Sequence, residues 1–118
     1  MHAVRFISCE DDGTDQIVSF AIEYGETGVR SLILLRSPKY EAVLDHAERG
    51  VSVSLENDAS DDVDALEVIR IEAKRVTIET QTSKYELDVS RVDPVEVSEM
   101  KTLIRRMNFD DRFRIEVV

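Results

Sequence analysis

Residues 17–36, IVSFAIEYGETGVRSLILLR, hold two apolar runs separated by a four-residue turn with glycine at each end. Glycine tolerates the backbone angles of tight turns, so the stretch predicts an antiparallel hairpin of strands 17–24 and 29–36. The second strand is apolar on both faces from Leu32 to Leu35, which predicts an inner strand covered on both sides. A β-sheet is therefore expected at the centre of the fold.

Alternation of apolar and polar residues predicts further strands on both sides of this hairpin. Residues 66–90 give three strands joined by very short connections, which is typical of a meander. The final segment is expected to be an edge strand. The strands predicted outside the hairpin are residues 3–8, 51–56, 66–74, 75–81, 84–90 and 112–118.

Two helices are expected, over residues 94–107 and about 38–48. Asp93 at the N-cap, Pro94 at the first helical position and Glu96 at the third predict a capping box. An apolar stripe follows at helical spacing, typical of a helix packed on a sheet. It comprises Val97, Met100, Leu103, Ile104 and Met107.

The segment 38–48 also has apolar residues at helical spacing, namely Tyr40, Val43, Leu44 and Ala47, and Gly50 follows as a stop signal. With 118 residues, the chain is expected to form a single domain, 1–118. The predicted class is α+β, a mostly antiparallel sheet with the two helices packed on it.

The negative charge is concentrated in the first part of the chain. Residues 1–67 hold 15 Asp and Glu against 5 Lys and Arg, which accounts for the whole net charge of −10, whereas residues 68–118 hold 10 of each. Phosphate binding needs clustered Lys and Arg, so we expect a basic protein as partner and no nucleic acid. The alternative is that the acidity only keeps the protein soluble.

The densest acidic stretch is 55-LENDASDDVDALE-67. A calcium loop starting at Asp58 fails, because its sixth position is Val63 instead of glycine and its twelfth is Ile69 instead of glutamate. Weak divalent binding by the clustered carboxylates remains an alternative. We expect this stretch to form a partner-binding surface, with Glu10, Asp11, Asp12 and Asp15 as an optional extension. Its predicted contact residues are Glu56, Asp58, Asp61, Asp62, Asp64 and Glu67.

No catalytic residues, metal or cofactor are predicted. Cys9, His2 and His46 are the zinc ligands available from cysteine and histidine, and they follow no recognised spacing. The four glycines form no phosphate-binding loop, and no glycine-rich elbow surrounds a serine. Cys9 is either a small buried hydrophobe or a reactive thiol. The expectation is a protein that is not an enzyme.

Residues 1–9 lack the features of a signal peptide, and no apolar run approaches the roughly 18 residues of a membrane span. We therefore expect a cytoplasmic protein with no membrane partner.

Three groups of residues carry a resemblance to a known family. They are Leu34, Leu35 and Arg36; then Val53, Leu55, Asn57 and Asp58; then Leu66 to Ile71 with Arg75, Val76 and Ile78. Over residues 17–107 this order resembles immunity protein family ten of the bacterial polymorphic-toxin systems. The family's glutamine after the Asn-Asp pair and its later glycine pair are replaced here by Ala59 and Asp64-Ala65.

The resemblance implies a protein that binds a cognate toxin and blocks its active site or an adjacent exosite. A carboxylate-rich surface suits a basic toxin. Two other classes remain open: a homo-oligomeric structural or adaptor protein that pairs through residues 112–118, and a small-ligand or weak cation-binding module. Asn57 and Asp58 have a structural alternative as well, since Asx side chains shape turns after strands.

Overall fold

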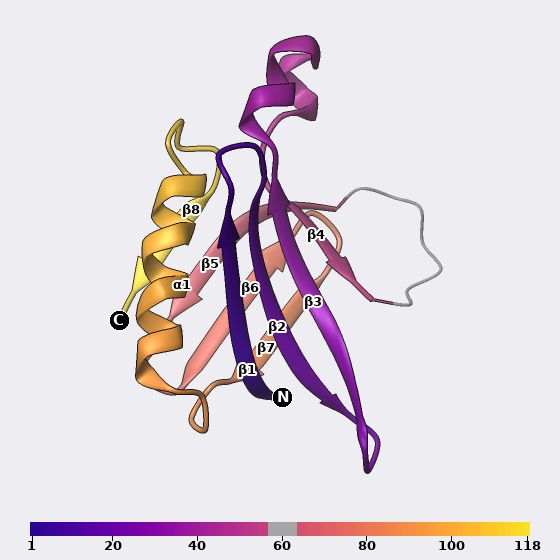
Figure 1. The fold of residues 1–118 in the computed structure, drawn as a ribbon, viewed down its shortest axis with the longest axis vertical. Helices are drawn as coiled ribbons and strands as arrows, with labels where there is room; N and C mark the ends of the chain where they lie inside the picture. Colours follow the sequence, from indigo (N-terminus) through magenta and orange to yellow (C-terminus); the bar gives the residue numbers. More distant parts are fainter. Residues whose placement is uncertain (57–63) are drawn as a thin grey trace.

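The computed structural model describes residues 1–56 and 64–118. Within these stretches, eight strands form one sheet, accompanied by one α-helix and two short 3-10 helices (Figure 1). In chain order the elements are β1 (His2–Asp11), β2 (Gln16–Tyr24), β3 (Gly28–Arg36), η1 (Pro38–Val43), η2 (His46–Glu48), β4 (Ser52–Leu55), β5 (Asp64–Ile71), β6 (Arg75–Thr80), β7 (Lys84–Asp88), α1 (Pro94–Met107) and β8 (Arg114–Val117).

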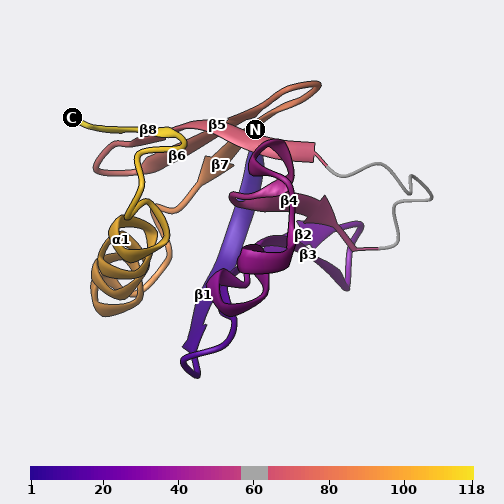
Figure 2. The same ribbon diagram turned by 90° about the horizontal axis from the view of Figure 1, so that it is seen from above.

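The strand order is β4-β3-β2-β1-β7-β6-β5-β8, and the sheet bends back so that β4 also pairs with β5. Figure 2 shows the result as two layers, β1–β3 on one side and β5–β8 on the other, with α1 at the open side between them. The side chains between the layers form the core. Its fully buried members include Val18, Phe20, Leu32, Leu34, Ile69, Ile78, Leu87, Met100, Ile104 and Met107.

The α+β class is confirmed, but the sheet is mixed. Neighbouring strands in the chain pair antiparallel, including the 17–36 hairpin and the β5-β6-β7 meander. Two pairings are parallel: β1 with β7 at His2 and Ala3, and β5 with β8 across residues 68–71 and 114–117. Both join segments far apart in the sequence, which alternation within one strand cannot reveal. The predicted edge strand at the C-terminus is confirmed as β8.

Helix α1 has the predicted N-cap but not the predicted capping box. The Asp93 carboxylate accepts a hydrogen bond from the Val95 N–H at 2.9 Å. Glu96 instead reaches out to β1, where its Oε1 accepts the Ile7 N–H at 2.7 Å. β1 pairs with β7 only at its start, so this carboxylate satisfies a backbone donor where α1 replaces the neighbouring strand. The predicted apolar stripe of α1 faces the core.

The predicted helix over 38–48 is wrong in both conformation and packing. The segment forms two 3-10 turns, interrupted where Leu44 is extended (φ −99°, ψ 150°), and projects past the end of the sheet (Figure 1). Tyr40 and Val43 are 61 % and 86 % exposed, so the apolar spacing does not mark a core face. The buried residue of the segment is Glu41, because its carboxylate is bound by Arg36.

Arg36, at the end of β3, is 1 % exposed and has a partner for each of its five N–H groups. It binds the Glu41 carboxylate through Nε and Nη2 at 2.9 and 2.8 Å. It binds the Asp110 carboxylate through Nη1 and Nη2, both at 2.8 Å. Nη1 also donates to the Met107 carbonyl at the C-terminal end of α1. The Phe109 ring lies over the guanidinium, 4.1 Å from its carbon.

This ion cluster lowers the pKa of both carboxyl groups. The hydrogen bond from Arg36 holds the pKa of Asp110 well below its usual range against the opposing effect of burial, and Arg112 adds to it. Burial raises the pKa of Glu41, but the hydrogen bonds from Arg36 and from the Gly50 N–H outweigh it, so the net shift is downward. Both groups are therefore held as carboxylates by the folded state.

Replacing Arg36 by methionine is expected to lower the free energy of unfolding by about 3–5 kcal/mol, because two carboxylates at least partly buried lose their cation. The measurement is urea unfolding followed by circular dichroism at pH 7. Arg30→Met is the matched control, since Arg30 stacks on the exposed Tyr24 ring at 4.7 Å and should matter by less than about 1 kcal/mol. Equal effects of the two substitutions would contradict the prediction.

The stability of the protein should also depend on acid pH. A lowered carboxyl pKa stabilises the fold fully above the unfolded value of about 4, and this contribution is lost as the pH falls through the lowered values. We expect the free energy of unfolding to fall between about pH 4 and pH 2. The Asp110→Asn variant should have a lower free energy of unfolding at pH 7, and this free energy should decrease less between pH 4 and pH 2. An unchanged acid slope in that variant would contradict the assignment.

Candidate partner-binding surface

The structure describes half of the predicted acidic surface. Glu56, Asp64 and Glu67 lie in the described residues, whereas Asp58, Asp61 and Asp62 lie outside them. Residues 56 and 64 stand at the two ends of the segment 57–63, one just after β4 and the other at the start of β5. These two strands pair with each other, so both carboxylates belong to one region of the sheet.

Glu56 is attached to β3. Its backbone N–H donates to the Ser31 carbonyl at 2.8 Å, and its Oε2 accepts the Ser31 N–H at 3.0 Å. Arg30 donates to the Glu56 carbonyl at 3.2 Å. The carboxylate is therefore exposed but fixed in place, which lowers the entropy lost if a partner binds it.

Asp64 is held by the turn between β6 and β7. Its Oδ2 accepts hydrogen bonds from the hydroxyl groups of Thr80 and Thr82, at 2.5 and 2.9 Å. It is half-buried and pairs across the sheet with the core residue Val53. Its other carboxylate oxygen, Oδ1, is buried, so Asp64 is a structural residue of the β4–β5 junction and not a surface charge.

Glu67 lies at an irregularity of β5, between the paired residues Leu66 and Val68. The extra residue there lets both Leu66 and Ile69 face the core and leaves Glu67 exposed. Its carboxylate is therefore available on the surface.

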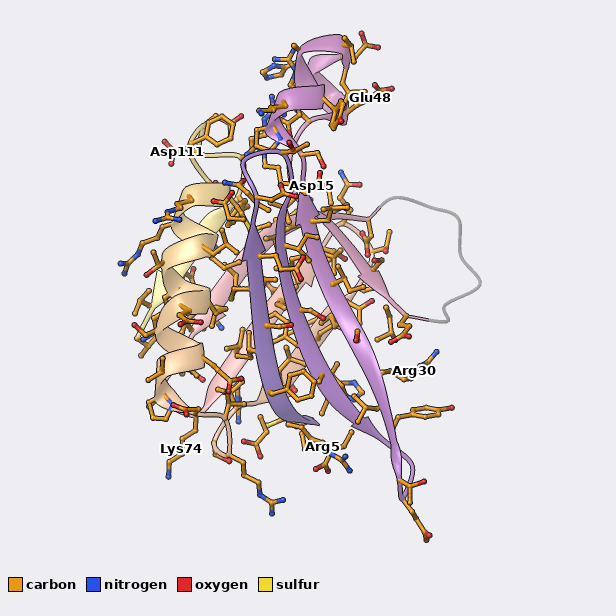
Figure 3. The ribbon with its side chains drawn as sticks, viewed as in Figure 1. Arg5, Asp15, Arg30, Glu48, Lys74 and Asp111 are labelled. Carbon is orange, nitrogen blue, oxygen red and sulfur yellow. The ribbon has the colours of Figure 1, made fainter. Side chains whose placement is uncertain are left out.

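The acidic turn at residues 10–15 is a separate feature. Asp12 Oδ1 accepts the Thr14 and Asp15 N–H groups at 2.9 and 2.8 Å, which lowers the pKa of this exposed carboxyl, and Asp15 accepts the Ser37 hydroxyl. Figure 3 places Asp15 towards one end of the β2–β3 hairpin and Arg30, the neighbour of Glu56, towards the other. The structure does not bring the two acidic segments together into one patch.

A groove of about 320 Å³ lies between β1 and α1, lined by Cys9, Glu10, Asp11, Ser98, Glu99, Thr102, Leu103 and Arg106. Burial, with Glu99 and Glu96 nearby, raises the pKa of the Cys9 thiol to about 11. Cys9 packs partly against the core, and neither histidine lines the groove. These observations favour a packing residue over a nucleophile.

His46 lies on the projecting segment, where its Nδ1 is 3.1 Å from Arg112 Nη2. In the part of the chain that the structure describes, no three His, Cys, Asp or Glu side chains are grouped so that they could hold a metal ion. None of the helices there is long and apolar enough to cross a membrane.

The sequence prediction missed a surface. β3 is an inner strand, between β2 and β4, but among the described elements only its core-facing side is covered. Ile33 and Leu35 point away from the core and are half-buried, as is Ile17 on β2. We call the outward side chains of β1–β4 the front face. The available signal was serine alternating with these apolar residues at positions 19, 31, 52 and 54, which is unusual for a face covered by a second layer.

Comparison of the chain with protein-family models, curated proteins and solved structures finds no match. The resemblance to immunity proteins therefore remains a prediction based on the quoted residues.

Cys9 should react slowly with a thiol reagent such as Ellman's reagent at pH 8, because little of a thiol with a pKa of about 11 is ionised there. We expect a rate one to two orders of magnitude, roughly, below that of the same thiol in the urea-unfolded chain. Similar rates in the folded and unfolded states would identify Cys9 as a reactive thiol instead.

Proposed function

We propose that this protein is a non-enzymatic immunity protein that binds and neutralises a cognate basic toxin. The observation that carries the proposal is the fixed position of the exposed Glu56 carboxylate, next to the β4–β5 junction where the acidic segment begins. The resemblance of residues 17–107 to immunity proteins supplies the biological role. We place the interaction in the cytoplasm.

Long-range electrostatics support a basic partner. The net charge is −10, and the whole excess lies in residues 1–67. Such an imbalance raises the local concentration of a positively charged protein and its association rate, and it disfavours nucleic acid. Toxin binding next to the β4–β5 junction would require no chemistry from the immunity protein, only a surface that competes with the toxin's own ligands.

The alternative is a homo-oligomeric adaptor that pairs through residues 112–118. In its favour, β8 stands at the end of the strand order. However, β8 has only four residues, and Arg114 and Glu116 alternate along it. Short, charged edge strands discourage pairing with another chain. A molecular mass that stays monomeric across a wide concentration range in light scattering would exclude this alternative.

Reversing three charges of the acidic segment, Asp58, Asp61 and Asp62 to lysine, is expected to slow association with the toxin about tenfold or more at low salt and to flatten its salt dependence. Asp64 is left unchanged because Thr80 and Thr82 bind it. The probe is the inactivated protein encoded by the neighbouring gene, measured by stopped-flow or biolayer interferometry.

The control is Glu72, Glu79 and Glu86 to lysine, which changes the net charge by the same amount on the β5–β8 layer. It should slow association much less. Equal slowing by both variants would mean that only net charge matters, and the absence of a complex with the unmodified protein would refute the proposed function.

A further inference from the structure

The middle of the front face is almost free of charge, whereas Arg5 of β1 and Glu23 of β2 form an exposed ion pair at 3.5 Å at the end of the face far from the β1–β2 turn. Along β1–β4, alternate residues such as Val18, Phe20, Leu32, Leu34 and Val53 are buried in the core, so the residues between them point outward. Strand register places these outward residues in three rows: Phe6–Ala21–Ser31, Ser8–Ser19–Ile33–Ser54 and Glu10–Ile17–Leu35–Ser52. Glu10, at a corner of the last row, is the one ionisable side chain in them.

The opposite layer, β5–β8, has a solvent-exposed sheet face with a different composition. We call the outward side chains of β5–β8 the back face. Register aligns them in the rows Glu116–Arg70–Thr77–Glu86 and Arg114–Val68–Glu79–Lys84. Charges of both signs alternate, and neighbours form ion pairs, with Arg70 and Arg114 at 2.7 and 2.9 Å from Glu116 and Lys84 at 3.8 Å from Glu79.

The contrast between the two faces is informative because both belong to one small domain. In Figure 1, β1–β3 lie in front of β5–β7, and no helix crosses them. Among the described elements, α1 is at the side of the two layers and nothing lies over the front face (Figure 2). Phe6 is 50 % exposed there, placed outward by an irregularity of β1 between Val4 and Phe6. Uncharged, partly apolar faces of this kind mark interaction sites.

The acidic residues around the front face favour a basic protein over a second copy of this chain as its binding partner. Glu56 stands at the β4 border of this face, and Asp12 and Asp15 stand in the β1–β2 turn beyond Glu10. A second copy would bring a net charge of −10 against another −10. A partner with an apolar patch surrounded by lysine and arginine would instead meet an uncharged centre and an acidic rim, the usual anatomy of a protein interface.

We propose that the front face is the docking surface for this basic protein partner, with Ile17, Ile33 and Leu35 as its apolar centre. The proposal rests on the proposed function and deepens it: the acidic borders attract and orient the toxin, and the front face holds it. The outward serines are small, so a partner element can approach the sheet closely. Shape and apolar contact at this centre should determine how long the complex lasts.

Uncharged substitutions distinguish an effect on the dissociation rate from an effect on the electrostatically driven association rate. Ile33→Gln and Ser19→Gln, made singly, alter the centre of the front face without changing charge. Val68→Gln is the matched control, because Val68 is also half-buried and points outward on the back face. Association and dissociation rates are measured with the inactivated product of the neighbouring gene, and circular dichroism checks that each variant is folded. Ser19→Gln keeps the test possible if Ile33→Gln unfolds the protein.

We expect both front-face variants to dissociate about tenfold to a hundredfold faster, with association rate and salt dependence unchanged. Val68→Gln should behave as the unmodified protein. If the unmodified protein binds and the front-face variants dissociate at its rate, the docking surface is wrong while the proposed function stands. If the unmodified protein binds nothing, both are refuted. A homodimer that Ile33→Gln dissociates in sedimentation would assign the face to a second copy and overturn the basic partner.

Discussion

The buried Arg36 guanidinium is the interaction on which the arrangement of the described elements most depends. It joins the end of β3, the start of the projecting segment through Glu41, the C-terminal carbonyl of α1 and the turn before β8 through Asp110. Asp110 also binds Arg112, whose guanidinium donates to the carbonyls of His46 and Arg49. One cation thereby links the end of β3 and the projecting segment to the end of α1 and the turn before β8, which lie more than 70 residues further along the chain.

A buried ion pair is not in itself evidence of high stability, because removing both charges from water costs several kcal/mol. Its value here is geometric. All five donors are used, and a guanidinium has only one orientation in which that is possible. The same cluster fixes the end of β3, the central strand of the front face, so the position of that face relative to α1 and β8 depends on Arg36.

The sequence predicted what depends on local periodicity. The 17–36 hairpin, the meander and the α1 stripe follow from residue spacing alone, and each is confirmed. The failures concern carboxylates bound inside the fold. Glu96 left its capping position for the Ile7 N–H, which is 89 residues away in the chain. Glu41 rather than the apolar residues of 38–48 turned inward, because Arg36, itself held by Asp110 and the Met107 carbonyl, bound its carboxylate. The parallel pairings of β1 and β8 are equally non-local.

The candidate surface likewise has features that the sequence reveals and features that only the sheet register reveals. Charge density is visible in a sequence, so the acidic stretch was identifiable, but the anchoring of Glu56 by Ser31 and of Asp64 by Thr80 and Thr82 required the register of the sheet. The front face was hidden by the run Leu32–Leu35, whose apolar character on both sides is typical of a covered strand. Only the position of β3, with the core on one side and no described element on the other, separates these two explanations.

An acidic border beside an uncharged sheet face also has a consequence for specificity. Charge acts over about 8–10 Å at physiological salt and attracts any basic protein, whereas apolar contact acts only at touching distance and depends on shape. A surface built from charge alone would bind many basic proteins weakly. The uncharged rows around Ile33 allow discrimination among the partners that the carboxylates attract, because a basic protein lacking a complementary apolar patch would leave these rows exposed to water. Under the proposed function, selectivity between related toxins should therefore depend on the residues of the front face more than on the number of acids beside it.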